Sequence, residues 1–233
     1  MPSHNHQIRR PVRSFVIRGG RLTPGQRRAF ERYWPVYGVE TEDQPLDFFK
    51  LFGNRNPVWL EIGFGNGESL VQMAALYPER NYLGIEVHPP GVGHCLLKAA
   101  EADIDNLRLV NQDAMQVLRD HIPAASLAGL QLFFPDPWHK KRHHKRRIVQ
   151  PDFLALAARS LQPGGIFHAA TDWRDYAEHI LRLLHEHPAF ENLSADGTYI
   201  PRPQDRPLTK FEQRGQRLGH GVWDLQFKRL LLK

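Results

Sequence analysis

Short apolar runs alternate with amphipathic stretches along most of this 233-residue chain. The apolar runs have the length of buried strands, and the stretches between them repeat apolar residues at helical spacing. The predicted strands cover residues 58–62, 81–87, 107–110, 130–134, 166–170 and 222–232. The predicted helices cover residues 68–76, 95–103, 114–121, 151–161 and 176–187. This order predicts an α/β fold with a mainly parallel, doubly wound sheet.

Polar residues follow the predicted strands at their carboxyl ends. A glycine turn begins at Gly63, and the carboxylates Glu86, Asp113, Asp136 and Asp172 lie at or just after later strand ends. In open α/β sheets, ligands bind beyond the carboxyl ends of the strands. We therefore expect five separate positions of the sequence to meet at one rim of the sheet.

Glutamate side chains stand on both sides of the glycine turn. Gly63, Gly65 and Gly67 are spaced Gly-x-Gly-x-Gly after Glu61, and Glu68 stands where the dinucleotide pattern has its third glycine. Glycines let the backbone approach a ligand closely, but a carboxylate at position 68 opposes a pyrophosphate. The turn therefore disfavours NAD and suits a ligand with a cationic centre and no phosphate, such as S-adenosylmethionine.

Two carboxylates fit the rest of such a ligand. Glu86 closes the second strand, where it can accept hydrogen bonds from a ribose diol. Asp113 follows the third strand, where it can receive an adenine amino group. Considered alone, each carboxylate is equally compatible with a surface position or a helix-capping role.

The fourth strand ends in Pro-Asp-Pro-Trp138, followed by a basic run of six cations and three histidines, His139 to Arg147. A carboxylate beside a flat aromatic suits a planar polar ring, and the cations suit a polyanion that carries the ring. The first 32 residues hold a second basic segment of net charge +7, and the remaining chain is net −7. This asymmetry indicates phosphate binding, with a solvated basic loop as the alternative. The sequence thus points to an enzyme that acts on a nucleic-acid base.

Composition limits the cellular context and the metal chemistry. The single cysteine, Cys95, excludes an intrachain disulfide, and no apolar run approaches the ~20 residues that cross a bilayer. We therefore expect a cytoplasmic protein. His139, His143 and His144 lack a second ligand pair and lie among cations, so we expect no metal site.

Five blocks of the sequence carry a resemblance to a known family. They are Glu61-Ile-Gly-Phe-Gly-Asn-Gly67, Gly84-Ile-Glu-Val-His88, Phe134-Pro-Asp-Pro-Trp-His-Lys-Lys-Arg142, Thr171-Asp-Trp173 and Thr209-Lys-Phe-Glu-Gln-Arg-Gly215. On these blocks the chain resembles the bacterial tRNA (guanine-N7)-methyltransferases from Arg13 to Lys233. The resemblance implies a Rossmann-like class I S-adenosylmethionine-dependent fold with a seven-stranded sheet. It also implies methyl transfer to N7 of a guanosine in the tRNA variable loop, usually position 46.

The resemblance also assigns roles to residues. The cofactor-binding positions would be Glu61, Gly63, Gly65, Gly67, Glu86, Asp113 and Asp136, and Asp136 would also be catalytic. The substrate-binding positions would be Lys140, Asp172, Thr209, Lys210, Phe211 and Glu212. The RNA-binding positions would be Arg142, His143, His144, Lys145, Arg146 and Arg147.

Several alternatives stay open at the level of sequence. Asp136-Pro-Trp138 also resembles the motif of enzymes that methylate exocyclic amines, and a catalytically silent RNA-binding protein could keep the same fold. Asp136 either stabilises the charge that develops on the guanine ring or binds its N1–H and exocyclic amine, and Asp172 and Glu212 are rivals for this recognition of the base. Trp138 either stacks on the base or forms a lid over the strand end. We expect residues 1–32 to be a basic extension and 33–233 a single domain, and we expect a monomer.

Overall fold

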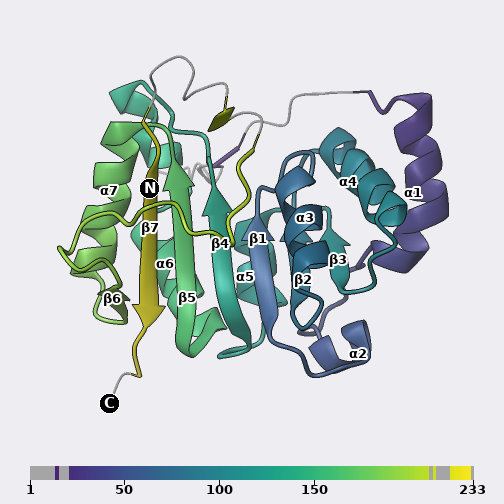
Figure 1. Cartoon of the computed structure of the whole chain (residues 1–233), viewed down its shortest axis with the longest axis horizontal. Coiled ribbons are helices and arrows are strands. Elements are labelled where there is room, and N and C mark those ends of the chain that lie inside the picture. Colours follow the sequence, from purple (N-terminus) through teal and green to yellow (C-terminus); the bar gives the residue numbers. More distant parts are fainter. Residues whose placement is uncertain (1–13, 16–20, 210–211, 214–220, 232–233) are drawn as a thin grey trace, which may run out of the picture.

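The computed structural model describes residues 14–15, 21–209, 212–213 and 221–231, and it contains a seven-stranded sheet (Figure 1). The strands are β1 (Val58–Ile62), β2 (Asn81–Ile85), β3 (Leu107–Val110), β4 (Leu127–Phe133), β5 (Leu161–Thr171), β6 (Phe190–Asn192) and β7 (Trp223–Arg229). Their order is β3-β2-β1-β4-β5-β7-β6, and only β7 pairs in the antiparallel direction. The predicted mainly parallel, doubly wound sheet is confirmed.

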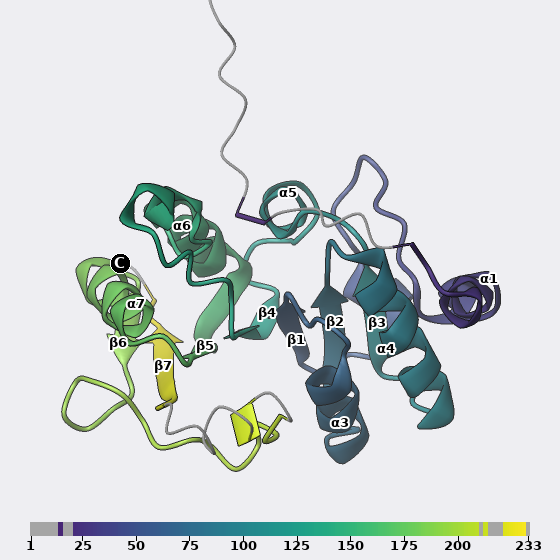
Figure 2. The same cartoon turned by 90° about the horizontal axis from the view of Figure 1, so that it is seen from above.

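Helices cover both faces of this sheet. They are α1 (Pro24–Tyr37), α2 (Phe48–Phe52), α3 (Glu68–Leu76), α4 (Pro89–Glu101), α5 (Ala114–Asp120), α6 (Pro151–Ser160) and α7 (Arg174–Glu186). Figure 2 shows α5 and α6 on one side of the sheet and α3 on the other. Among the described helices, none is long and apolar enough to cross a bilayer.

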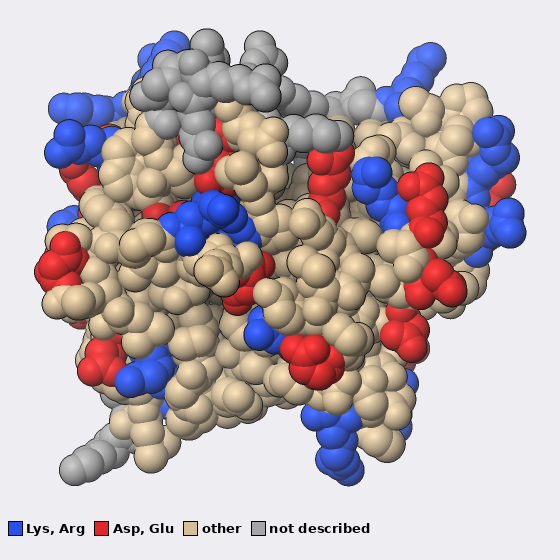
Figure 3. All heavy atoms as spheres, viewed as in Figure 1, with Lys and Arg blue, Asp and Glu red and all other residues tan. Residues whose placement is uncertain are grey.

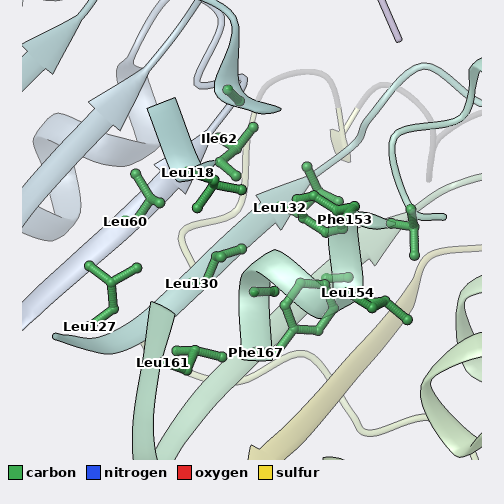
Figure 4. Packing of buried hydrophobic residues seen from close by; sticks show 14 of the residues in the cluster. Leu60, Ile62, Leu118, Leu127, Leu130, Leu132, Phe153, Leu154, Leu161 and Phe167 are labelled. Atoms are coloured by element: carbon green, nitrogen blue, oxygen red, sulfur yellow. The ribbon is translucent and has the colours of Figure 1, made fainter. Parts of the chain in front are cut away.

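Alternating strand residues supply two apolar cores. Along β1, Leu60 and Ile62 belong to the core under α5, α6 and α7, where Leu118 lies beside them and Phe153 lies near Leu132 (Figure 4). Trp59, which precedes Leu60, packs against the second core, under α1, α3 and α4. The period of two between successive side chains places these neighbours on opposite faces. Burial of apolar side chains on both faces therefore fixes the register of the central strands.

Helix α1 was not predicted, although its start carries a capping signature. The Thr23 hydroxyl accepts a hydrogen bond from the backbone of Gln26, and the Gln26 side chain accepts one from the Thr23 backbone. Gln26 also donates to the Pro90 carbonyl at 2.9 Å, which joins α1 to the start of α4. The boundary expected after residue 32 falls within α1, which is joined to α4 by this hydrogen bond.

Helix α4 begins at Pro89, earlier than the predicted Cys95, because two prolines occupy its first turn, where a missing N–H costs nothing. The short strand β6 was also not predicted. The long predicted last strand, 222–232, is the seven-residue β7.

The face of β5 and β7 on the α3 side is covered by a loop rather than a helix (Figure 2). Polar side chains are buried there. His168 on β5 lies 2.9 Å from Asp224 on β7, and Asp224 accepts two hydrogen bonds from Arg206 in the loop. The loop is therefore held to the sheet by ion pairs as well as by apolar contact.

Candidate functional site

The strand order reverses between β1 and β4, and a cavity of about 520 Å³ opens at the carboxyl ends of these strands. We call it the rim cavity. Its wall contains Gly63, Glu86, Asp113, Asp136 and Trp138, among other residues. The structure thus brings together four of the five positions that the sequence placed at one rim, and the fifth, Asp172, lines a separate cavity described below.

Three glycines shape the turn after β1. Gly63, Gly65 and Gly67 have φ of 72°, 58° and 75°, a conformation that side chains with a Cβ rarely adopt. A Cβ at Gly63 or Gly65 would point into open space, whereas one at Gly67 would lie 2.3 Å from the Cys95 sulfur. The first two glycines therefore expose backbone to a ligand, and the third allows α3 to pack against α4.

Glu61 is buried at the end of β1 and lines a second cavity of about 400 Å³, which we call the glycine-turn cavity. Burial, together with the nearby Glu86 carboxylate, raises the pKa of Glu61 to about 8. No described residue donates a hydrogen bond to its Oε2 atom. A buried carboxyl without a partner is costly, so this position suits a ligand that brings a positive charge or a hydrogen-bond donor.

Glu86 binds backbone as well as facing the rim cavity. Its Oε2 atom accepts from the Gly65 N–H at 2.9 Å, and its Oε1 atom accepts from the N–H groups of Val87 and His88. A carboxylate has about four acceptor sites, so about one is left for a hydroxyl group. The expected acceptance of two hydrogen bonds from a ribose diol therefore requires the Gly65 contact to open.

Asp113 is the N-cap of α5. Its Oδ1 atom accepts from the Met115 N–H at 2.9 Å, while the side chain lines the rim cavity. The capping role and the predicted ligand-facing role therefore coexist in one carboxylate.

Asp136 is exposed and lies in the turn after β4, where its Oδ1 atom accepts from the Trp138 N–H at 2.9 Å. Trp138 and Phe134 have φ of 47° and 50°, unusual values for bulky side chains. The turn therefore holds strained backbone on both sides of the carboxylate. Such strain persists where the surrounding contacts over-determine the geometry, as around functional groups.

The indole of Trp138 is enclosed. The Arg146 guanidinium lies 4.1 Å from its ring centre, and His143 meets its edge at 5.9 Å. Its N–H donates to the Ser14 carbonyl at 3.2 Å, and Ser14 and Phe15 complete the wall of the rim cavity. Of the two predicted roles of Trp138, the lid agrees with these contacts. The contribution of Ser14 and Phe15 was not predicted, because nothing in the sequence links them to the fourth strand.

The basic run forms a 3₁₀-helix, Lys141–Arg146, beside this turn. Lys140, Lys141, Arg142 and Lys145 are exposed, as expected for residues that meet phosphates. Burial and the neighbouring cations Arg142 and Arg146 keep the pKa of His143 below its usual range, so this ring adds little charge at neutral pH.

Arg147 does not fit its predicted role. Its side chain is only 1% exposed, and it donates to the Pro137 carbonyl at 2.9 Å and to the Asp175 carboxylate. It also contacts His144 at 3.1 Å and lies over the Tyr176 ring. The hydrogen bond from Arg147 lowers the pKa of Asp175. Arg147 therefore ties the Pro-Asp-Pro turn to α7, and in this conformation its side chain is buried rather than presented to RNA.

Glu212 likewise turns inward. Its two carboxylate oxygens accept hydrogen bonds of 2.6 Å and 2.8 Å from Arg206, and its side chain is 1% exposed. Burial opposes the charge of Arg206, but its hydrogen bonds with Glu212 and Asp224 outweigh this effect and raise its pKa. Glu212 therefore does not face a substrate in this conformation. Of the two residues Asp172 and Glu212, Asp172 remains as the candidate for recognition of the base. Thr209 lines the glycine-turn cavity, and Lys210 and Phe211 lie outside the described residues.

Asp172 lines a third cavity of about 590 Å³, which we call the tryptophan cavity. Trp173, Trp223 and His139 form its aromatic walls. Phe134 and Pro135 belong to both this cavity and the rim cavity, so the two adjoin at the end of β4. Within the described part of the chain, no group of three or more His, Cys, Asp or Glu side chains could hold a metal ion.

Sequence comparison gives a consistent family. A family model described as "Putative methyltransferase" matches residues 55–225. The tRNA (guanine-N(7)-)-methyltransferase of Shewanella amazonensis is 59% identical over 221 residues, which cover 95% of this chain and 93% of the relative. The protein of the same name from Cronobacter sakazakii is 60% identical over 221 residues, with 95% and 92% coverage.

Comparison with solved structures supports the fold alone, because the identities are low. The 16S rRNA methyltransferase KamB aligns with a TM-score of 0.60 at 18% identity, over 84% of this chain and 99% of that protein. A variant of the 16S rRNA (adenine(1408)-N(1))-methyltransferase from Catenulisporales acidiphilia, solved with its cosubstrate SAM, aligns with a TM-score of 0.55 at 15% identity. That match covers 82% of this chain and 94% of the other protein.

Proposed function

This chain belongs to the family of the tRNA (guanine-N(7)-)-methyltransferases, and we propose that it transfers a methyl group from S-adenosylmethionine to N7 of a guanosine at position 46, in the variable loop of tRNA. The observation that carries the proposal is the pair of adjoining cavities at the end of β4. One is lined by carboxylates and open glycine backbone, and the other by aromatic rings and Asp172. Such a pair suits a cationic cofactor beside a planar base.

The residues present fit the cofactor. Gly63 and Gly65 leave open space where a Cβ would stand, and the buried Oε2 atom of Glu61 has no donor among the described residues. Glu61 would face the cationic part of S-adenosylmethionine, Glu86 the ribose and Asp113 the adenine. The cofactor, when bound, supplies the methyl group on a positively charged sulfur.

The protein's chief task in this reaction is alignment. Guanine N7 already carries a lone pair, so no protein base has to remove a proton before transfer. Fixing the two reactants in line can contribute about 7–11 kcal/mol. The strained turn at Phe134 and Trp138, tied to α7 by Arg147, gives the rigidity that alignment needs.

Asp136 is the proposed catalytic residue. As the methyl group moves, positive charge develops on the guanine ring, and a carboxylate fixed in advance lowers the energy of that state. The hydrogen bond from the Trp138 N–H holds the Asp136 carboxylate in place at the wall of the rim cavity.

Exposed cations of the basic run are the proposed tRNA contacts. Lys140, Arg142 and Lys145 project from the segment that follows the Asp136 turn. On the face viewed in Figure 3, further basic side chains gather along the edge formed by α1, where Arg27, Arg28 and Arg32 are exposed. We propose that the protein acts as a monomer in the cytoplasm, and that both basic regions bind tRNA phosphates.

Nucleoside analysis tests the proposal. Unmodified tRNA is incubated with the protein and S-adenosylmethionine, digested, and separated by liquid chromatography with mass spectrometry. We expect 7-methylguanosine, mapped to position 46 by fragment analysis. Methyl on an exocyclic amine would refute the assigned atom, and 7-methylguanosine elsewhere would refute the assigned position.

A further inference from the structure

Two tryptophans flank the Asp136 turn, and their surroundings differ. Trp138 is covered by Arg146 on one ring face and is hydrogen-bonded to Ser14 through its N–H group. Trp173 is 39% exposed, and its ring centre lies 4.3 Å from that of His139, with an angle of 67° between the two ring planes. Trp173 is therefore the tryptophan with ring surface left for a ligand.

The position of Trp173 connects it to the reacting end of the molecule. It is the N-cap residue of α7, and its backbone N–H donates to the Thr171 hydroxyl at 3.2 Å. It lines the tryptophan cavity, which shares Phe134 and Pro135 with the rim cavity. The two cavities adjoin at these shared residues, so a ring held against Trp173 would lie next to a ligand in the rim cavity.

Asp172 gives the tryptophan cavity a chemical preference. Its carboxylate lines the cavity, and no described residue donates a hydrogen bond to it. Among the four RNA bases, only guanine presents two adjacent donors, N1–H and the exocyclic amine, that match the two oxygens of one carboxylate. The N7 atom of guanine lies on the other side of the purine, so a guanine bound in this way turns N7 away from Asp172.

We propose that Trp173 stacks on the target guanine in the tryptophan cavity, beside Asp172, which the family resemblance already assigns to the substrate and which would bind the N1–H and amino group, while Trp138 serves as a lid of the cofactor cavity. This inference rests on the proposed function and assigns the base-binding site within it. The base must leave its stack in the folded tRNA, and an aromatic surface offsets part of that cost.

Four variants test this division of roles: Trp173→Ala, Trp173→Phe, Trp138→Ala, and Phe49→Ala as a control at an exposed aromatic residue that lines none of the three cavities. For each folded variant, checked by circular dichroism, we would measure kcat/KM for tRNA, the Kd of S-adenosylmethionine by calorimetry, and the Kd of tRNA. Loss of stacking should lower kcat/KM of Trp173→Ala by about 5- to 150-fold. Trp173→Phe should restore most of this rate, and neither change should alter the cofactor Kd more than about twofold, because Trp173 does not line the rim cavity.

Trp138→Ala should instead weaken cofactor binding, and Phe49→Ala should leave all three quantities unchanged. The inference is overturned if Trp173→Ala keeps the wild-type kcat/KM, or if its loss is matched by an equal loss of cofactor affinity. Wild-type protein that yields no 7-methylguanosine would refute the proposed function and this inference together. Wild-type product with an unaffected Trp173→Ala variant would refute the inference alone.

Discussion

Binding of S-adenosylmethionine should expel a proton from Glu61. Burial and the Glu86 carboxylate raise the pKa of Glu61 to about 8, so at pH 7 the carboxyl is about 90% protonated without ligand. A positive charge in the glycine-turn cavity favours the ionised carboxylate. A return of the pKa to its ordinary value of 4.5 corresponds to at most about 5 kcal/mol of favourable interaction. About 0.9 proton should therefore leave this group for each cofactor bound at pH 7.

Calorimetry in buffers of different ionisation enthalpy measures this proton. The slope of the observed binding enthalpy against the buffer's ionisation enthalpy gives the number of protons released. Glu61→Gln is the matched control, because it keeps the size of the side chain and removes its titration. Subtracting its slope also removes any proton taken up by the amino group of the cofactor.

The pH dependence of affinity gives a second readout with a fixed sign. As pH decreases below 8, the affinity of the wild-type protein for S-adenosylmethionine should fall by up to about tenfold per pH unit relative to that of Glu61→Gln. The reason is that the cofactor must then displace the proton on Glu61. Equal slopes and equal pH profiles for the two proteins would refute the proposed contact between Glu61 and the cationic part of the cofactor.

Other consequences of the structure can be measured separately. Because its folded-state pKa is raised, Glu61 should make the ligand-free protein less stable as pH rises from 4.5 through 8, by about 2–5 kcal/mol relative to Glu61→Gln; denaturant unfolding with no such difference would contradict its buried state. Asp136→Ala should lower kcat by about 10²-fold or more while tRNA affinity changes little, and a large loss of tRNA binding in a filter assay would overturn the catalytic role. Arg147→Ala should lower the free energy of unfolding by about 1.5–3 kcal/mol through the loss of charge-assisted hydrogen bonds, and it should leave the salt dependence of tRNA binding intact; a smaller salt slope for this variant would mean that Arg147 does contact RNA phosphates. Replacing Arg142 and Lys145 by Ala should reduce the slope of log Kd against log salt by roughly 0.7–0.9 per lost phosphate contact, and an unchanged slope would mean that these side chains bind no phosphate.

Much of the sheet and its rim follows from local patterns. The apolar runs and the glycine turn are consecutive in the sequence, and parallel strands bring their carboxyl ends to one edge without further information. For this reason the sequence alone places Glu86, Asp113 and Asp136 together at one edge of the sheet.

The sequence is least informative where the direction in which a side chain points, rather than its residue type, decides the role of the residue. Arg147 ends a run of cations, yet the 3₁₀-helix turns this one side chain inward toward Asp175. Glu212 is paired with Arg206, six residues away in the same loop, and the fold brings Asp224 of β7 to the same guanidinium. Charge in a sequence therefore predicts a function well only while the charge is not needed for an ion pair within the protein.

The most direct test of methyl transfer to N7 uses tRNA that differs from the substrate by a single atom. Two ligated transcripts would carry either guanosine or 7-deazaguanosine at position 46, and methyl incorporation from labelled S-adenosylmethionine would be measured on each. The account predicts one methyl group per guanosine transcript and none on the 7-deaza transcript, which keeps the edge that Asp172 is proposed to bind and lacks only the accepting nitrogen. Equal incorporation into both transcripts would contradict transfer to N7.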